Sequence, residues 1–537
     1  MIDKTYATLK EMYDSSVALF STRPAFSTFQ QEQLTYAAFA ERVEAFAAIY
    51  KQYGLKNGDK IALLSQNMPN WPAAYFAAVT AGMVIVPILP DFSAAEVDHI
   101  LRHSDARALV VSTKQYPKIA PELAETLSVV ICADDLSVLH GVVAPAVLWQ
   151  EQTIDPEELA VIIYTSGTTS SPKGVMLSHR NLCTQVAMLL DIQDVQEWDI
   201  FVSLLPLSHT YECTLGMLLP FQNGASVVYI SKAPTAKVLL PIFQAVRPTI
   251  VLSVPLIIEK IYRNSIRPQF TSRPWMAKAY ELMPVRKVLH RVAGKKLYAL
   301  FGGRLRFFGV GGAKLDPIVE RFLYEAKFPY AIGYGLTETA PLLAGSPPSR
   351  VGLGTTGPTL KGVTLRIDNP HPASGEGEIV AQGPNVMMGY YKNPEATAEA
   401  FTADGWFRTK DLGHFDRDGY LTIRGRLGNM ILGASGENIY PEEIEHVINS
   451  YSYVTDSLVK VEKGRLVALV EFNREELAKQ YGVWKEELEA KIEQLREELL
   501  CYVNARVNRF SRLSYVYVQG QAFEKTPTHK IKRFLYH

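Results

Sequence analysis

A run of thirty residues without a charged side chain, Ile61–Pro90, constrains the fold of this chain more than any other feature. It is long enough to cross a membrane as one helix. Polar and helix-breaking residues interrupt it, however, and divide it into strand, helix and strand. These residues are Asn67, Asn70, Pro72, Gly82, Pro87 and Pro90. Because strands and helices that are both apolar are typical of a parallel sheet covered on both faces, we expect an α/β fold and no transmembrane helix.

The same alternation continues along the chain and then changes twice. Further apolar strands are predicted at 108–112, 128–133, 201–206, 225–230, 249–254 and 305–310. Gly- and Pro-rich short strands then predict a small antiparallel β unit over about 351–425, and strands mixed with a charged helix follow it. We therefore expect a large N-terminal domain of parallel βα layers over 1–427, which includes the β unit, and a small mobile α+β C-terminal domain over 428–537.

The bulk composition excludes several classes of protein. Lys and Arg number 55, as do Asp and Glu, so the basic excess that is usual in nucleic-acid-binding proteins is missing. The four cysteines form no CxxC pair, which argues against a disulfide framework or a zinc site and fits a reducing cytoplasm. The first residues, MIDKTYATLKEMY, have no apolar segment of a secretory signal. We therefore expect a cytoplasmic protein that binds no nucleic acid.

The stretch YTSGTTSSPKG, Tyr164–Gly174, combines six small hydroxyl residues with one cation, Lys173. Such a composition is also found in flexible linkers. Here an apolar strand, Leu159–Tyr164, precedes it, and Ser178 is predicted to cap a helix that runs to about Leu190. Backbone N–H groups, hydroxyls and a lysine in such a frame favour phosphate binding. It is not a Walker A loop, because the lysine is followed by glycine and valine.

This stretch resembles the phosphate loop of the adenylate-forming superfamily, which includes acyl-CoA synthetases, luciferases and adenylation domains. The loop of that superfamily usually reads YTSGTTGxPKG, and Ser170 replaces one glycine here. The resemblance implies ATP, Mg²⁺ and coenzyme A (CoA) as cofactors and a carboxylic acid as substrate. It implies that the β- and γ-phosphates contact Thr165, Ser166, Gly167, Thr168, Thr169 and Lys173.

Two glycine-rich motifs further along the chain extend the resemblance. FFGVGGAKLDP, 307–317, lacks the third glycine and the acidic residue of a dinucleotide fingerprint, which disfavours a dehydrogenase. In the family this turn forms a wall of the adenine pocket, which implies roles for Gly311, Gly312 and Ala313. GYGLTETAP, 333–341, implies that Tyr334 and Gly335 contact adenine, that Thr337 reaches the α-phosphate and that Glu338 holds Mg²⁺.

The C-terminal third of the chain carries the remaining motifs of the family. The resemblance implies that Asp411 binds the ribose, with Arg426 nearby, although Lys410 stands where glycine is usual. The hinge position is Gly428 rather than Asp or Lys, and Ser435 and Gly436 would lie beside the CoA path. In the terminal motif EKTPTHKIKRF, His529 replaces a glycine and Lys530 falls at the catalytic lysine.

The expected substrate is a fatty acid, because LPLSHTYE, 205–212, is similar to the motif of the long-chain acyl-CoA synthetase branch. This similarity implies a substrate pocket that contains His209, Tyr211 and Gly309. Amino-acid-activating relatives usually carry an Asp in the pocket, whereas only Glu212 is acidic here. Transfer to an acyl carrier protein, another carboxylic acid such as an aryl or amino acid, and a nucleotide-binding pseudoenzyme are kept as alternatives. A homodimer is also left open.

One region, 263–306, is strongly basic in a chain that is otherwise balanced. It contains eleven Lys or Arg residues and one acid, Glu281, mixed with large apolar residues. Three interpretations are open: a solvated helical hairpin, a patch that binds anionic lipid at the inner membrane surface, and a site for the phosphates of CoA.

Overall fold

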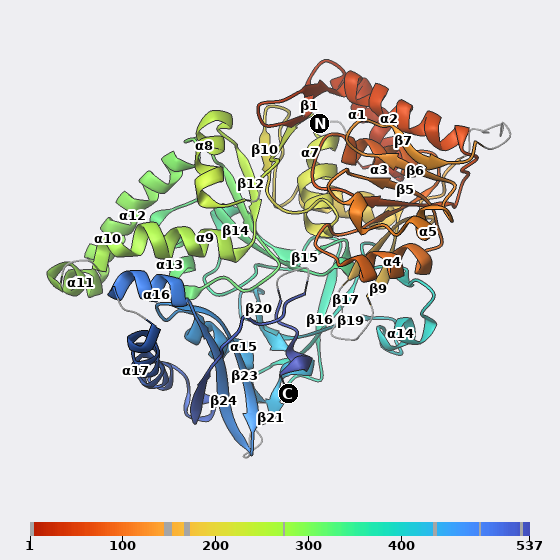
Figure 1. Ribbon diagram of the computed structural model, residues 1–537. Helices are drawn as coiled ribbons and strands as arrows, with labels where there is room; N and C mark the ends of the chain where they lie inside the picture. The colour runs from red at the N-terminus through yellow and green to blue at the C-terminus, as the bar shows by residue number, and fades with distance from the viewer. Residues whose placement is uncertain are drawn as a thin grey trace.

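The computed structural model describes residues 5–143, 153–165, 172–232, 234–271, 274–432, 438–482, 485–526 and 530–536. Within these residues the N-terminal part is built on two eight-stranded sheets, each parallel in its middle and antiparallel at its ends. Figure 1 shows them in the upper half of the molecule, with the C-terminal part in blue below. The predicted α/β class is therefore confirmed.

The first sheet contains the charge-free run. Its strand order is β18 (Gly389–Tyr390), β9 (Lys173–Ser178), β8 (Leu159–Thr165), β4 (Val84–Pro87), β3 (Lys60–Leu64), β5 (Ala106–Val111), β6 (Val129–Cys132) and β7 (Val138–Gly141). The run folds as the predicted strand, helix and strand, and every residue of the helix between β3 and β4, α3 (Asn70–Val79), is buried. No helix among the described residues is long and apolar enough to span a membrane.

The second sheet continues the alternation. Its order is β15 (Leu342–Gly345), β14 (Tyr330–Gly335), β13 (Phe307–Val310), β12 (Ile250–Ser253), β10 (Ile200–Ser203), β11 (Ser226–Tyr229), β1 (Pro24–Thr28) and β2 (Gln33–Thr35). The strands predicted at 201–206, 225–230, 249–254 and 305–310 are all present, although each is shorter than its apolar run.

Helices fill and cover the two sheets. The largest apolar core lies between them and includes residues of α1 (Leu9–Phe20), α2 (Tyr36–Gln52), α3 and α6 (His179–Leu189). The outer face of the first sheet packs on α4 (Ala94–His103) and α5 (Pro121–Ala124). The outer face of the second packs on α8 (Ala236–Val246), α9 (Pro255–Ile261), α12 (Met283–Leu300) and α13 (Pro317–Ala326). Both sheets are thus buried on both faces, as their apolar strands require.

Two smaller units follow. The antiparallel sheet β16 (Thr364–Asp368), β17 (Gly377–Gln382), β19 (Phe407–Phe415) and β20 (Leu421–Arg426) is the predicted β unit, and α14 (Pro394–Glu399) lies between β18 and β19. A short hairpin of β21 (Ile431–Leu432) and β22 (Asn438–Ile439) leads to a last sheet with its own apolar core. That sheet and its helices are β23 (Val454–Glu462), β24 (Arg465–Phe472), β25 (Tyr515–Val518), α15 (Pro441–Asn449), α16 (Arg474–Tyr481) and α17 (Lys485–Asn504).

Polar contacts hold the C-terminal unit against the rest of the chain. Arg424 Nη1 lies 2.9 Å from Glu443 Oε1, and the Tyr440 hydroxyl donates a hydrogen bond to Glu376 over 2.9 Å. On the α13 side, His446 Nε2 lies 3.9 Å from Asp316 Oδ1. The contacts are few and polar, in contrast to the apolar cores on either side, and an interface of this kind is compatible with domain movement.

Candidate active site

The two described ends of the phosphate-loop motif belong to neighbouring, paired strands. β8 and β9 pair antiparallel, with Thr165 opposite Lys173 and Tyr164 opposite Gly174. Ser178 then caps α6, as predicted, and its hydroxyl accepts a hydrogen bond from the Asn181 backbone N–H over 3.2 Å. The strand β9 was not anticipated from the sequence. Four of the predicted phosphate contacts, Ser166, Gly167, Thr168 and Thr169, lie outside the described residues.

The turn GLTETAP follows β14 and presents Glu338. Its geometry depends on Gly335, because a Cβ there would lie 1.9 Å from the Pro341 carbonyl oxygen, closer than any side chain can approach. The Leu336 backbone N–H donates to Thr339 Oγ1 over 3.1 Å and closes the turn. Glu338 Oε1 accepts a hydrogen bond from the Tyr390 hydroxyl over 2.9 Å.

A segment that the sequence did not single out, 384–391, joins this turn to β9. The Met387 N–H donates to the Glu338 carbonyl over 2.8 Å, and the Tyr391 N–H donates to the Gly174 carbonyl over 2.8 Å. The buried Asn385 amide donates to the Thr339 carbonyl over 2.8 Å. Only two adjacent tyrosines after a glycine, in GYYKNP, marked this segment in the sequence.

Asp411 and Arg426 face each other across β19 and β20. Arg426 Nε lies 2.8 Å from Asp411 Oδ1, and the Tyr334 hydroxyl donates to Asp411 Oδ2 over 2.8 Å. Burial raises the pKa of Asp411, although Arg426 and Tyr334 oppose that shift. The neighbouring Lys410 adopts φ +59°, a left-handed conformation that favours glycine. Glycine, the residue expected at this position from the family motif, would adopt this conformation without strain.

Lys530 lies near the same carboxylates. Lys530 is solvent-exposed, yet partial loss of hydration beside the surrounding protein and the charge of Arg426 lower its pKa, while Asp411 and Glu338 act in the opposite direction. His209 is near enough to respond to Lys530, and burial, with a smaller contribution from Lys530, lowers the pKa of His209 to about 4. His209 is therefore neutral at physiological pH. The fold thus brings Glu338, Asp411 and Arg426, which lie up to 192 residues from Lys530 in sequence, close enough to Lys530 to interact with it electrostatically.

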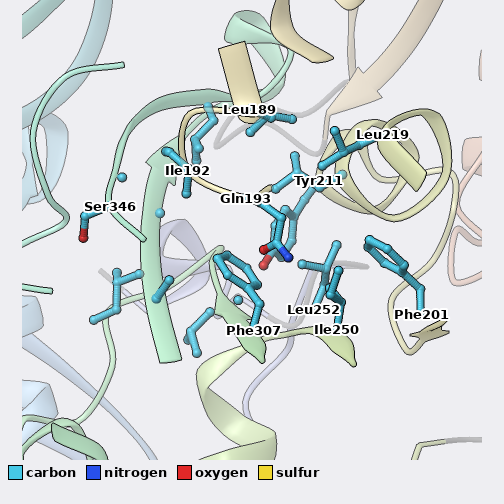
Figure 2. A pocket seen from close by; sticks show the side chains of 18 residues that line it. Leu189, Ile192, Gln193, Phe201, Tyr211, Leu219, Ile250, Leu252, Phe307 and Ser346 are labelled. Carbon is cyan, nitrogen blue, oxygen red and sulfur yellow. The ribbon is translucent and has the colours of Figure 1, made fainter. Parts of the chain in front are cut away.

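An apolar cavity of about 30 Å³ lies between the second sheet and the helices that cover it (Figure 2). Of the residues predicted for a substrate pocket, Tyr211 and Gly309 line this cavity, whereas His209 is not among its described lining residues. A Cβ on Gly309 would lie 3.0 Å from the Tyr211 hydroxyl oxygen, and one on Gly311 would lie 3.3 Å from the Tyr211 ring. The glycine-rich turn therefore makes room for this tyrosine. Gly312, with φ +84°, lies in the same turn, followed by Ala313.

The walls of this cavity are aliphatic or aromatic with few exceptions. Figure 2 shows Gln193 and Tyr211 near its centre, with Phe201 and Leu219 to one side and Ser346 to the other. Gln193 is 7% exposed, and its Oε1 has no hydrogen-bond partner among the described residues. The volume is sufficient for about one water molecule. The apolar walls therefore show which kind of group the cavity favours, but its volume does not give the length of a ligand.

Glu212 lies behind the cavity in a π-helical segment, η2 (Glu212–Leu218). Its Oε1 accepts a hydrogen bond from the Ser203 hydroxyl over 2.6 Å, and Gly216 leaves space for the carboxyl group. Burial raises the pKa of Glu212 to about 8. The side chain is therefore mostly protonated at neutral pH and is not among the described residues that line the cavity.

Gly428 is exposed in a short 3₁₀ turn, η6 (Leu427–Asn429), directly after β20. A Cβ at this position would meet no atom within 4 Å. Ser435 and Gly436 lie outside the described residues. The described residues contain no group of three His, Cys, Asp or Glu side chains that could hold a metal ion.

Known proteins resemble this chain in sequence and in fold. The sequence profile of AMP-binding enzymes matches residues 13–391. A fatty acyl-CoA synthetase A of Dictyostelium discoideum is 27% identical, over 93% of this chain and 83% of that protein. A long-chain-fatty-acid–CoA ligase of Mycobacterium bovis is 31% identical, over 79% of this chain and 75% of that protein. Among solved structures, O-succinylbenzoate coenzyme A synthetase from Bacillus subtilis in complex with AMP shares the fold, with a TM-score of 0.76 and 21% identity over 98% of this chain and 97% of that one.

Proposed function

Because this chain belongs to the AMP-binding enzyme family, we propose that it joins a fatty acid to CoA in two steps through an acyl-adenylate. The observation that carries the proposal is the convergence of Glu338, Asp411 and Arg426 on Lys530. The apolar cavity and the names of the similar proteins support a fatty acid as the substrate.

In the first step an oxygen of the carboxylate attacks the α-phosphorus of ATP. The bond to the β-phosphate oxygen breaks, and the products are acyl-AMP and pyrophosphate. Repulsion between the two anions opposes this step, so cations and positioning should supply most of the catalysis. Lys530 would bridge the carboxylate and the α-phosphate, and Lys173 would hold the β- and γ-phosphates. Thr337 would donate to the α-phosphate.

The remaining residues would bind the nucleotide and the metal. Asp411 would accept hydrogen bonds from the ribose hydroxyls, and Tyr334 would stack on the adenine near Gly311. Glu338 would hold Mg²⁺, which neutralises charge on the triphosphate. A single carboxylate fits this ion, because Mg²⁺ is usually bound by one or two carboxylates together with substrate phosphates and water.

In the second step the thiol of CoA, as its thiolate, attacks the acyl carbonyl and AMP leaves. No side chain is needed as a strong base, because a thiol titrates close to neutral pH. We propose that the C-terminal domain, 428–537, turns about Gly428 between the steps and moves Lys530 away from the N-terminal domain, 1–427. Transfer to an acyl carrier protein is the alternative, and an acceptor assay with each thiol distinguishes them.

The pocket argues against an amino acid as substrate. An α-ammonium group requires a charged partner, and Glu212 is mostly neutral and is not among the described residues that line the cavity. The apolar walls would instead bind an alkyl chain. The chain would have to displace side chains such as Leu219, because the cavity itself is small.

Exchange of labelled pyrophosphate into ATP tests the proposed function directly. We expect exchange only with ATP, Mg²⁺ and a fatty acid, and we expect acyl-CoA when CoA is added. A matched series of fatty, aryl and amino acids identifies the substrate class. The absence of exchange with every carboxylic acid would refute the ligase assignment. Exchange without formation of acyl-CoA would support only the first step, the formation of acyl-AMP.

We also propose that the basic region binds an anionic membrane surface. The region forms a helical hairpin of α10 (Arg267–Thr271), α11 (Pro274–Glu281) and α12, at the left edge of Figure 1. Along α12 the exposed Lys287, Arg291 and Lys295 recur every four residues, beside the exposed Val288 and Val292. Trp275 is 64% exposed on α11. A surface of this kind lets apolar groups enter the headgroup layer while each cation contributes about 1 kcal/mol.

Some cations of the region make contacts within the protein instead of facing solvent. Arg286 makes two hydrogen bonds to Glu325, of 2.9 and 3.1 Å, and therefore fixes α12 to α13. His290 Nδ1 lies 2.8 Å from the same carboxylate. The face of α12 that carries Arg286 and His290 thus packs against α13, and only the opposite, exposed face could contact a membrane.

Replacing Lys287, Arg291, Lys295 and Lys296 with glutamine should reduce sedimentation with phosphatidylglycerol liposomes at low salt by tenfold or more, because about four favourable charge contacts are lost. High salt should weaken binding of the natural protein in the same way. The control replaces four exposed cations elsewhere, Lys51, Lys56, Lys361 and Arg417. No binding of the natural protein at low salt contradicts the membrane proposal, and a raised KM for CoA in the first variant would favour CoA as the partner.

A further inference from the structure

We infer that Tyr390 is a positioning residue that holds the metal-binding carboxylate of Glu338 and the phosphate-binding ammonium of Lys173 apart, ready for ATP. The inference rests on the proposed function, which gives Glu338 and Lys173 their roles. Tyr390 contacts both groups. Its hydroxyl donates to Glu338 Oε1 over 2.9 Å, and Lys173 Nζ lies 5.2 Å from the centre of its ring.

The backbone of Tyr390 is fixed by contacts on both sides. In β18 it pairs with Val175 of β9, two residues after Lys173. Its N–H donates to Thr397 Oγ1 over 2.9 Å, in α14. Two residues earlier in the same segment, Met388 N–H donates to the Met176 carbonyl over 3.0 Å. The ring therefore has a defined position relative to both β9 and the turn.

The two charged groups would otherwise attract each other. Lys173 and Glu338 form no ion pair in the part of the chain that the structure describes, although one residue contacts both of them. A direct pair would occupy the groups that must meet the phosphates and the ion. The ring attracts the cation through its face, and the hydroxyl binds the anion at its edge. Lys173 and Glu338 thus each have a favourable contact with Tyr390 and do not form an ion pair with each other.

The hydroxyl of Tyr390 contacts only one oxygen of the Glu338 carboxyl group, Oε1. The second oxygen of Glu338 is left for the metal.

The test compares Tyr390→Phe, which removes only the hydroxyl, with Tyr390→Leu, which also removes the ring face. Tyr391→Phe is the matched control, because its hydroxyl binds Asp105 on the surface, over 2.9 Å. Equilibrium binding of ATP is measured with and without Mg²⁺ and without turnover. Pyrophosphate exchange is then measured as a function of the Mg²⁺ concentration.

We expect Tyr390→Phe to weaken binding of Mg·ATP about fivefold to tenfold and to raise the Mg²⁺ concentration for half-maximal exchange, with the KM for the fatty acid unchanged. Tyr390→Leu should also weaken binding of ATP without Mg²⁺, because Lys173 loses its support. Tyr391→Phe should match the natural protein in each measurement. A merely structural role would instead lower the melting temperature and weaken all substrates together.

A double-mutant cycle separates Tyr390 from Glu338. If the hydroxyl acts through this carboxylate, adding Tyr390→Phe to Glu338→Gln should change Mg·ATP binding by less than twofold. An undiminished loss in the double variant, or no loss in the single variant, overturns the inference. ATP binding remains measurable even if the natural protein forms no acyl-adenylate, so failure of the proposed function is recognised separately.

Discussion

Replacing Lys530 with alanine should reduce acyl-adenylate formation by a factor of about 100 to 1,000 or more, yet leave thioester formation from supplied acyl-AMP within about threefold. The reason is that only the first step brings two anions together, and a positioned cation at a developing charge contributes effects of this size. Lys530 lies near Glu338 and Asp411, where that charge would form. Pyrophosphate exchange measures the first step, and CoA consumption with synthetic acyl-AMP measures the second.

A neighbouring lysine provides the control for this variant. Lys532 belongs to the same terminal segment, where its backbone N–H donates to the Glu524 carbonyl over 2.9 Å. Among the described residues, the side chain of Lys532 forms no ion pair with Asp411 or Glu338, whose side chains contact Arg426 and Tyr390 respectively, so Lys532→Ala should keep both half-reactions. Equal losses in the two half-reactions of a folded Lys530→Ala protein would show that its role is not confined to adenylation.

The large elements of this fold could be predicted because their signals are local. Strands buried on both faces must be apolar throughout, and Pro and Gly separate them from the helices, as in Ile61–Pro90. The strand β9 was not predicted, because KGVMLS follows a phosphate-loop motif, after which we expected a helix. Its pairing with β8 is a contact that a local pattern does not reveal. The sequence KGVMLS also lacks the alternation of polar and apolar residues that indicates a half-buried strand.

The site was predictable as separate motifs but not as an arrangement. Residues such as Lys173, Glu338 and Asp411 stood out because their chemistry and their neighbours matched a known pattern. The role of 384–391 was not visible, because most of its contacts are made by backbone groups that any sequence possesses. Lys410 shows the reverse case, since it replaces the expected glycine yet adopts a left-handed conformation that favours glycine. Burial of Glu212, which decides its charge, also follows only from the packed structure.

Replacing Gly428 with proline should reduce thioester formation at least tenfold while adenylation stays within about threefold. Gly428 lies at the second position of the 3₁₀ turn η6, where proline's fixed φ of about −65° is compatible with the backbone and the missing N–H is not needed for the helix. This turn belongs to the state in which Lys530 lies near Glu338. Proline should therefore favour that state and oppose the rotation that the second step requires.

The two half-reactions of Gly428→Pro are measured separately, and Gly428→Ala is the matched control. A Cβ at this position meets no atom within 4 Å, so alanine should keep both rates near those of the natural protein. Its φ and ψ remain free to change, whereas proline's φ does not. If Gly428→Pro forms thioester at the natural rate, rotation must occur elsewhere, and the half-buried residues after it, beginning with Asn429, become the next positions to test.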